Sequence, residues 1–299
     1  MENTTNKGLV HGAAAYFLWG IFPIYWKLLK AAHPLEIFCH RILWSLLFVA
    51  FILLMLRRGE WLMVARQRRT LLLFAGSSLL LAINWLTFIY AVNSGFIVEA
   101  SLGYFINPLF NVLLGFIFLR ERLRPAQTSA VGLAGLGVLW LTMRYGAFPW
   151  PAITLAVTFG LYGLLRKIAP LGSLEGLCLE TLILAVPALV GITILQCGGH
   201  ALFLHRFSPT LLLFFAGLVT AVPLILFSSS ARRISLTALG LLQYIAPTLQ
   251  FLVGVWVYHE PFSLQRFVGF AVIWTALAMY MIESYRHARA LTLSPAPIE

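Results

Sequence analysis

Polar side chains lie inside an otherwise apolar stretch of the chain, ASLGYFINPLFNVLLGFIFLRE at residues 100–121. Asn107 and Asn111 are four residues apart, so a helix would place both amides on one face together with Tyr104. Pro108 removes one backbone hydrogen bond and is expected to open the helix near Tyr104. Because lipid cannot satisfy amides or freed carbonyls, the pattern indicates a cavity lined by protein or water at membrane depth.

A second stretch, LQYIAPTLQFL, repeats this design with Gln243, Pro247 and Gln250. Two polar, kinked helices in matching positions point to a binding site between the halves of a transporter. The alternative is that the amides hydrogen-bond between helices and only hold them together. We expect Asn107 and Gln243 to line a cavity, whereas Asn111 and Gln250 are explained equally well as packing contacts.

Deep aromatic residues accompany these amides. Asn84 is followed by Trp85 and, one turn on, by Phe88, and Trp19 lies deep in the first apolar segment. Aromatic faces with a few amides suit a flat, amphipathic ligand that is only partly charged. The predicted substrate-binding residues are Trp19, Asn84, Trp85, Phe88, Tyr104, Asn107, Gln243 and Tyr244, with Pro108 and Pro247 as helix kinks.

Ionisable side chains inside apolar segments are costly in a bilayer and are therefore candidates for gating or coupling. The chain carries four such residues: His40, Arg41, Glu99 and Glu180. Arg41 and Glu99 start from the same face of the membrane, so we expect them to pair. Glu180 lies toward the opposite face and could pair with Arg166 or Arg232. For the other two, extension toward the nearest interface is an equal alternative.

The elements that must position these residues are membrane helices. Of the 299 residues, 61% are hydrophobic and 10% are charged, whereas a soluble domain carries about a quarter charged residues. About 20 apolar residues span the hydrocarbon core as a helix. Ten such segments are predicted, at residues 9–29, 35–56, 71–92, 96–119, 126–143, 149–167, 173–195, 209–230, 235–258 and 262–284. The chain is therefore expected to be an all-α integral membrane protein without a soluble domain.

Positive charge is distributed unevenly around these segments. If the N-terminus is cytoplasmic, fifteen of the 21 Lys and Arg residues lie on the cytoplasmic side. Positive charge favours that side, so both termini are expected to be inside the cell. Topology thus explains the net charge of +11, and no basic face on a soluble element supports nucleic-acid binding.

The second half of the chain repeats the first at an offset of 139 residues. The offset aligns Pro108 with Pro247, Gly115 with Gly254, and Glu121 with Glu260. Each half then holds five helices, and because five is odd the halves enter the membrane from opposite sides. The expected architecture is ten transmembrane helices in two inverted five-helix repeats, residues 9–145 and 149–284, followed by a cytoplasmic tail at residues 285–299.

Signatures of catalysis and of metal binding are missing from the sequence. The ten acidic residues are all Glu, which excludes the Asp-rich magnesium sites of membrane prenyl-transfer enzymes. No His, Cys or Glu cluster has zinc spacing, and the run SSS at residues 228–230 lacks a Gly-x-Ser-x-Gly elbow. We expect no catalytic residue, no metal and no cofactor. A channel would need rings of charge or a filter-like loop, and neither is found.

Five motifs are distinctive when taken together: FLWGIFPIYWKLL, HRILWS, NW at residues 84–85, EASLGYFINPLFN and LQYIAPTLQFL. They resemble the EamA branch of the drug/metabolite transporter superfamily, and the resemblance covers nearly the whole chain. It implies ten helices that arise from two five-helix repeats in the inner membrane of a bacterium. It also implies a permease, since related transporters carry amino acids or other small metabolites, usually outward.

We therefore predict a secondary transporter that exports a small amphipathic metabolite or drug by alternating access. The cavity is expected between the repeats, lined mainly by the first four helices of each, while the fifth and tenth helices serve packing. Import or facilitated diffusion of the same class of compound is the runner-up, and a membrane enzyme or channel is the class-level alternative. The expected partners are the substrate and the lipid bilayer. Proton coupling, and the choice between monomer and homodimer, are left open by the sequence.

Overall fold

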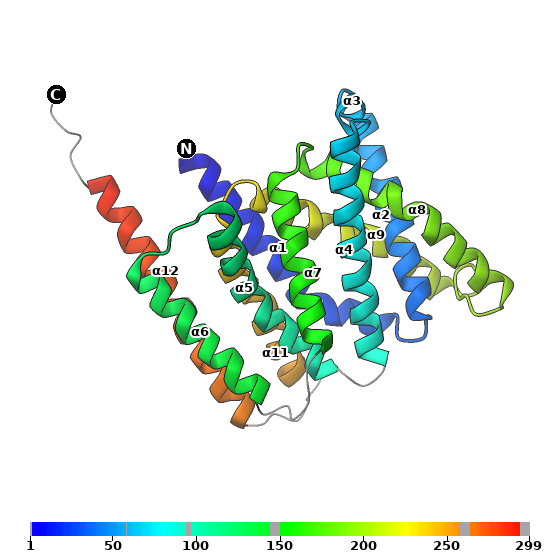
Figure 1. The fold of residues 1–299 in the computed structure, drawn as a ribbon. Coiled ribbons are helices and arrows are strands. Elements are labelled where there is room, and N and C mark those ends of the chain that lie inside the picture. Colours follow the sequence, from blue (N-terminus) through cyan, green and yellow to red (C-terminus); the bar gives the residue numbers. More distant parts are fainter. Residues whose placement is uncertain (1, 58, 94–96, 144–149, 258–263, 294–299) are drawn as a thin grey trace.

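The computed structural model describes residues 2–57, 59–93, 97–143, 150–257 and 264–293, and within these ranges some side chains, including those of residues 92–102, are not described. The regular secondary structure of these residues is helical, and turns and loops connect the helices (Figure 1). In chain order the helices are α1 (Glu2–Leu28), α2 (Pro34–Met55), α3 (Trp61–Ala65), α4 (Arg68–Asn93), α5 (Ile97–Leu119), α6 (Pro125–Met143), α7 (Trp150–Ile168), α8 (Ser173–Cys197), α9 (Phe207–Ala231), α10 (Leu236–Gln243), α11 (Ile245–Leu252), the π-helix η1 (Val253–Val257) and α12 (Leu264–Leu293).

Every apolar segment predicted from the sequence coincides with a helix or with a run of consecutive helices. Five of the described helices are long and apolar enough to cross a membrane, judged by length and composition: α1, α2, α4, α8 and α9. The short helix α3, between the second and third predicted segments, was not expected. The all-helical, membrane-type fold class is therefore confirmed, while the inversion of the two halves stays a prediction.

The two prolines expected to kink helices act differently. Pro108 lies inside α5, which runs through it without a break. The equivalent Pro247 follows a break at Tyr244, where α10 ends and α11 begins. Pro247 has no N–H group to donate to the Gln243 carbonyl, four residues earlier. At the break, the Tyr244 backbone N–H donates to the Leu241 carbonyl, three residues earlier, at 3.2 Å. One helix of the pair is thus continuous and the other is divided.

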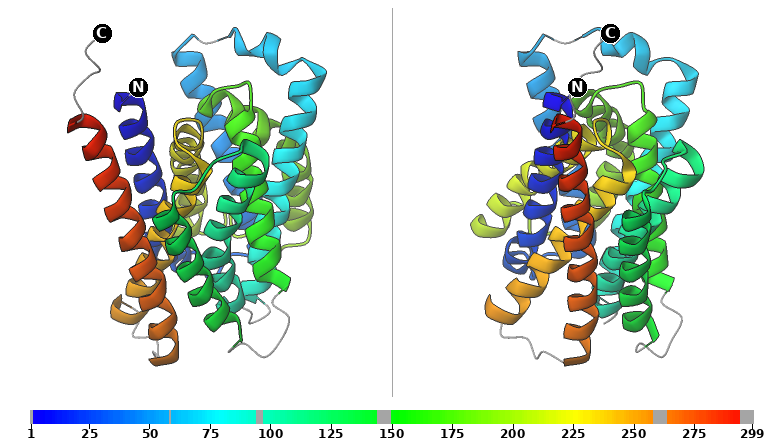
Figure 2. Two further views of the ribbon diagram at one scale, coloured as in Figure 1. Left: turned by 60° about the vertical axis from the view of Figure 1, so that its left-hand side comes forward. Right: turned by 90° about the vertical axis from the view of Figure 1, so that its left-hand side faces the viewer.

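The helices of the two halves interleave, as the two views of Figure 2 show. α1 packs on α9, α10 and α11, and α7 packs on α4 and α5. α2 and α8 pack against each other and against α9 and α4, respectively. α6 and α12 form a pair at one side of the molecule (Figure 1). The beginning of α1 and the end of α12 lie at the same end of the bundle as α3 (Figure 2).

The offset of 139 residues recurs in the folded chain. Tyr244 and Phe105, which are 139 residues apart, lie side by side with ring centroids separated by 6.3 Å, and the Tyr244 hydroxyl donates to the Phe105 carbonyl at 3.4 Å. Two helices of the second half begin at this same offset from their counterparts, α8 at Ser173 against α2 at Pro34, and α9 at Phe207 against α4 at Arg68. Equivalent sequence positions therefore begin equivalent helices.

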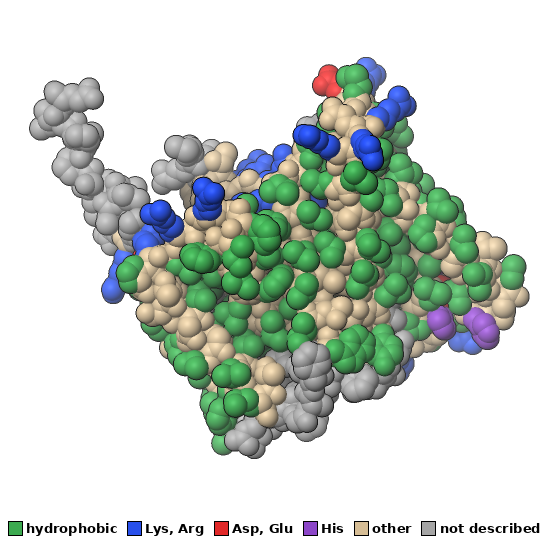
Figure 3. Space-filling model, in the orientation of Figure 1, with side chains coloured by type: hydrophobic (Ala, Val, Ile, Leu, Met, Phe, Trp, Pro, Cys, Tyr) green, Lys and Arg blue, Asp and Glu red, His purple; other side chains and the backbone are tan. Residues whose placement is uncertain are grey.

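Hydrophobic side chains cover the middle of the molecular surface (Figure 3). Lys and Arg side chains gather along the edge that carries α3, which is also the edge near the start of α1 (Figure 3). Large apolar residues such as Phe51, Leu54 and Phe118 are more than half exposed. A band of exposed apolar surface below a basic edge is what a protein embedded in a bilayer presents.

Candidate functional site

Glu180 is the centre of a buried polar network at the end of the bundle near α3. Its side chain is 0% exposed, as is that of Arg166, whose Nη1 lies 3.7 Å from Glu180 Oε1. The Ser77 hydroxyl donates to Glu180 Oε1 at 2.6 Å, and the Tyr162 hydroxyl donates to Oε2 at 3.3 Å. The sequence offered Arg166 or Arg232 as the partner of Glu180, and the structure places Arg166 there. Helices α4, α7 and α8 meet at this carboxylate.

The Arg166 guanidinium extends the network to a fourth helix. Its Nε donates to the Ser228 hydroxyl on α9 at 2.6 Å, and its Nη2 donates to the Gly172 and Ser173 carbonyls at 3.3 and 3.1 Å. A Cβ added at Gly176 would lie 1.9 Å from Arg166 Nη1. Glycine at this position therefore leaves the space that the guanidinium fills. We call Ser77, Tyr162, Arg166, Glu180 and Ser228 the inner network.

Other basic side chains at this end bind backbone carbonyls. Arg232 Nη1 donates to the carbonyls of Ala169 and Leu171, and Lys167 Nζ donates to the Ala231 carbonyl at 3.2 Å. Partial burial, together with the nearby Arg166 and Arg233 guanidinium groups, lowers the pKa of Arg232 below its ordinary value. These bonds tie the α7–α8 loop to the end of α9.

Glu121 makes a second connection at the same end. Its carboxylate accepts from the backbone N–H groups of Leu236 and Thr237, at 2.8 and 3.2 Å, and from the Thr237 hydroxyl at 2.9 Å. A helix N-terminus leaves such N–H groups unpaired and favours negative charge, and here it is the N-terminus of α10. A Cβ at Gly115 would lie 2.6 Å from Glu121 Oε2, so the spacing of this Gly–Glu pair has a steric reason.

Glu36, in the first turn of α2, also accepts backbone N–H groups, at the end of the bundle away from α3. The carboxylate Oε1 accepts from the backbone N–H groups of Leu202 and Phe203, both at 2.8 Å, and the side chain is buried. Sequence reasoning used Glu121 only to align the two halves and assigned no role to either glutamate. The usable signal was that each is an acidic residue at a predicted helix end, where free backbone N–H groups collect.

Arg41 lies in α2 among aromatic side chains from other helices. Its guanidinium carbon is 4.8 Å from the ring centroid of Trp26 and 4.2 Å from that of Trp85. Its Nε donates to the Thr220 hydroxyl on α9 at 2.9 Å. Glu99, the partner expected from the sequence, lies in the first turn of α5, where side chains are outside the described part of the structure. The Arg41–Glu99 pair therefore stays a prediction.

His40, the neighbour of Arg41, is buried and points elsewhere. The Trp44 indole N–H donates to His40 Nδ1 at 3.0 Å, and the imidazole centroid is 4.3 Å from that of Phe203. Its Nε2 is a buried atom without a hydrogen-bond partner among the described residues. His40 thus packs against the segment that Glu36 binds, and no described contact links it to Arg41.

The amides predicted to line a cavity contact neighbouring helices in this structure. Asn84 Nδ2 donates to the Leu155 carbonyl at 3.0 Å, and Asn107 Nδ2 donates to the Ala156 carbonyl at 2.6 Å. Asn111 Nδ2 lies 3.0 Å from Asn107 Oδ1 and 3.2 Å from Gln243 Oε1. The amides therefore join α4 and α5 to α7, and α5 to α10. Whether they line a cavity in another conformation stays a prediction.

A cluster of aromatic rings fills the bundle between α1, α7 and α9. Trp19 is 5.5 Å from both Tyr16 and Phe159 and 5.7 Å from Phe227, measured between ring centroids. Phe227 also stacks on Tyr162, a member of the inner network, at 5.9 Å. Trp19 was predicted to contact substrate, and here its ring packs directly against this cluster. The other rings of the cluster were not singled out from the sequence.

The remaining predicted site residues fall into two places. Phe88 and Tyr104 contact each other at 6.1 Å between ring centroids. Tyr244 is buried at the break between α10 and α11, against Phe105. The structure thus places Trp85 under the Arg41 guanidinium, Phe88 against Tyr104, and Tyr244 against Phe105.

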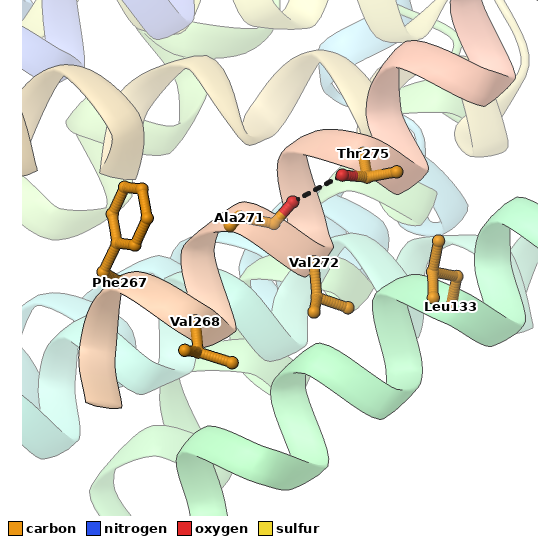
Figure 4. A pocket seen from close by; sticks show the side chains of 6 residues that line it. All are labelled: Leu133, Phe267, Val268, Ala271, Val272 and Thr275. Carbon is orange, nitrogen blue, oxygen red and sulfur yellow. Dashed lines mark hydrogen bonds between the residues drawn. The ribbon is translucent and has the colours of Figure 1, made fainter. Parts of the chain in front are cut away.

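A hollow of about 280 Å³ lies between α6 and α12. It is lined by Leu133, Phe267, Val268, Ala271, Val272 and Thr275 (Figure 4). The Thr275 hydroxyl donates to the Ala271 carbonyl of its own helix at 2.8 Å, which leaves the lining apolar. None of the predicted site residues contributes to it. Within the described part of the chain, no three His, Cys or Glu side chains are grouped as metal ligands.

Comparisons with known proteins place the chain among membrane transporters. Residues 6–143 match the EamA-like transporter family. The chain is 43% identical over 300 residues to the uncharacterized transporter YojE of Bacillus subtilis, covering 96% of this chain and 97% of that one. It is 44% identical over 290 residues to protein RarD of Streptomyces exfoliatus, covering 96% of this chain and 92% of the relative.

It is also 41% identical over 282 residues to protein RarD of Escherichia coli, covering 94% and 95% of the two chains. A crystal structure of a further protein superposes with a TM-score of 0.70 over 92% of this chain and 98% of the other, at 20% identity. That structural likeness shows a shared fold.

Proposed function

Because the chain belongs to the EamA-like transporter family, together with proteins named RarD, we propose that it is a secondary transporter that exports a small amphipathic molecule by alternating access. Membership of the family supports a membrane transporter. The direction, the substrate class and the mechanism are the proposal. The observation that carries it is the inner network, which joins four helices of the two halves through one buried ion pair.

The proposed topology has both termini in the cytoplasm of a bacterium, with the protein in the inner membrane. The basic edge near α3 and the start of α1 supports this orientation (Figure 3). The matching helix starts at an offset of 139 residues support two five-helix repeats. An odd number of helices in each repeat then requires the two repeats to be inverted, as in other transporters built from repeats.

In this orientation the inner network closes the cytoplasmic side. Its Ser77–Glu180 bond joins α4 of the first half to α8 of the second half, so separation of the halves on this side must break that bond, while the bonds of Arg166 hold α7, α8 and α9 together. The Glu121 bonds to the start of α10 must break or move with that helix. Alternating access requires two discrete arrangements of such contacts. A carboxylate that is paired in one state and hydrated in the other provides both.

Coupling would follow from the same carboxylates. Glu180 exchanges a buried pair with Arg166 for water when the cytoplasmic side opens, and a proton could bind to it in that state. Glu99 and Arg41 are proposed as the corresponding outer pair. Import or facilitated diffusion of the same class of compound would use the same gates, and the direction of net flux separates these alternatives from export.

Transport by purified protein in liposomes tests the function. Radiolabelled amphipathic compounds are presented on one side, with and without a pH gradient, and the recovered compound is analysed chemically. We expect saturable movement of an unchanged compound, faster from the cytoplasmic face. Chemical alteration of the compound, or no movement above that of empty liposomes across a broad panel, would contradict the proposal.

A further inference from the structure

The cation–π contacts of Arg41 do not use its hydrogen-bond donors. Its guanidinium lies over the rings of Trp26 and Trp85, and a contact of this kind uses charge without using an N–H group. A guanidinium has five N–H donors, and Thr220 takes the one on Nε. Among the residues that the structure describes, no acceptor bonds to the two terminal nitrogens, and the side chain is half-buried rather than enclosed.

The described carboxylates near the two ends of the bundle are engaged elsewhere. Glu36, on the same helix as Arg41, accepts two backbone N–H groups of residues 202–203. Glu180 is bonded within the inner network. Neither carboxylate balances the charge of Arg41. Glu99, its predicted partner, has a side chain outside the described part of the structure, so a carboxylate that arrives when the outer side opens would take the place of Glu99 on Arg41.

The surroundings of Arg41 suit the rest of an organic molecule. Trp85 packs against Phe38 at 5.9 Å, and Phe88 against Tyr104 at 6.1 Å, measured between ring centroids. Tyr104 is near enough to Arg41 for the two side chains to interact electrostatically. The site therefore combines two planar donors with aromatic surface contributed by several helices.

We propose that Arg41 binds a carboxylate of the transported molecule, and that the substrates are organic monoanions with an apolar or aromatic body. A planar guanidinium matches a carboxylate through two parallel N–H donations, which a neutral amide cannot reproduce with the same strength. A cationic group would be repelled by Arg41. The inference rests on the transporter function proposed above, since it names the class of substrate for that function.

A series of matched ligands tests the charge preference. The purified protein in lipid nanodiscs is titrated by calorimetry with three carboxylates of increasing ring size: benzoate, 2-naphthoate and indole-3-acetate. Each is compared with its own carboxamide, which has nearly the same shape and no charge, and tryptamine serves as the cationic comparison. We expect at least one carboxylate to bind about tenfold or more tightly than its amide, the factor that one charge-assisted hydrogen bond supplies.

Two substitutions at Arg41 and one control attribute that preference to the guanidinium. Arg41→Gln should reduce the preference to about threefold or less, and Arg41→Lys, which keeps the charge but loses the planar fork, should leave an intermediate value. Arg206→Gln removes the same charge from an exposed position at the start of α9 and should leave the preference unchanged.

Three results would overturn the inference. They are equal binding of acid and amide, a preference that survives Arg41→Gln, and the absence of binding by every member of the series. Liposome transport keeps the two proposals separate: transport without a charge preference refutes the anion site alone. An Arg41-dependent preference without transport refutes the transporter function and leaves a binding site.

Discussion

Two regions of the molecule hold ionisable side chains at corresponding positions, since Arg41 and Glu180 are related by the offset of 139 residues that also relates Phe105 to Tyr244. Glu180 is fully buried and bonded to Ser77, Tyr162 and Arg166. Arg41 is half-buried and has one hydrogen-bonded partner among the described residues, Thr220, beside two indole rings. Among the described residues, the first region is closed by internal pairing, whereas the second places no acceptor on the terminal nitrogens of Arg41.

The comparison also shows why the two charges have different consequences. Removing one partner of a buried ion pair is costly, because the other charge then stays buried without a partner or water. Replacing a half-buried cation that lies over aromatic rings removes only a modest attraction. The predictions below use this contrast, and they run from the largest expected effect on stability to the smallest.

Arg166→Met should give the largest effect. It leaves the Glu180 carboxylate buried without a cation, which costs about 3–5 kcal/mol when one partner of a buried pair is removed. Thermal unfolding in detergent should show a large loss of stability. Adding Glu180→Gln should restore a substantial part of it, because the unpaired charge is then gone. Additive losses in the double variant would show that the two groups do not stabilise each other.

Gly176→Ala should give the next largest effect. The added Cβ would lie 1.9 Å from Arg166 Nη1 and 2.8 Å from Phe74, so the guanidinium must leave its place. Overpacking of this kind costs about 1–3 kcal/mol. Gly132→Ala is the matched control, because that glycine has no heavy atom within 4 Å of the added methyl group and lies in a helix. The control should be neutral or slightly stabilising, and equal losses at both positions would refute the steric account.

Glu121→Gln should have a moderate effect on stability and a directional effect on accessibility. It removes the charge that holds the start of α10, and a hydrogen bond to a charged group contributes about 1.5–3 kcal/mol. A cysteine introduced at Ser228 of the inner network should then react faster with a thiol reagent that is added on the cytoplasmic side. Glu36→Gln, which weakens a similar contact at the other end, should not increase that labelling. Equal increases in both variants would mean that neither carboxylate holds a particular gate.

Arg41→Gln should have the smallest effect on stability, on the order of 1 kcal/mol, since it removes cation–π contacts and one hydrogen bond from a half-buried side chain. A double-mutant cycle with Glu99→Gln measures whether the predicted outer pair exists. A double variant milder than the sum of the single ones supports the pair, and strict additivity of transport rates would count against it.

The positions of the helices could be predicted from the sequence because membrane segments are defined by length and apolar composition alone. The partner of Glu180 could be narrowed from the sequence to two cations, Arg166 and Arg232, since both lie near the same end of the bundle as Glu180. The roles of Glu36 and Glu121 could not be predicted, because their partners are backbone N–H groups that become neighbours only after the helices pack.

The different behaviour of the two prolines was equally hidden from the sequence. Pro108 and Pro247 occupy matching positions, but α5 is continuous and α10 ends at Gln243. Which helix breaks depends on the contacts around each one, and here Tyr244 packs against Phe105 at the break. The amides were recognised as unusual, yet two of their partners on α7, the Leu155 and Ala156 carbonyls, are backbone groups that any sequence would supply.

The most direct test of alternating access is a distance measured across the inner network. Spin labels at Gln67, before α4, and Ile168, at the end of α7, are placed in a cysteine-free protein, and pulsed electron paramagnetic resonance gives the distance distribution. We predict one short-distance population in the resting protein and a second, longer population in the variant Arg166→Met with Glu180→Gln. A single distance that is unchanged in that variant, and unchanged by ligands that the protein transports, would contradict the account.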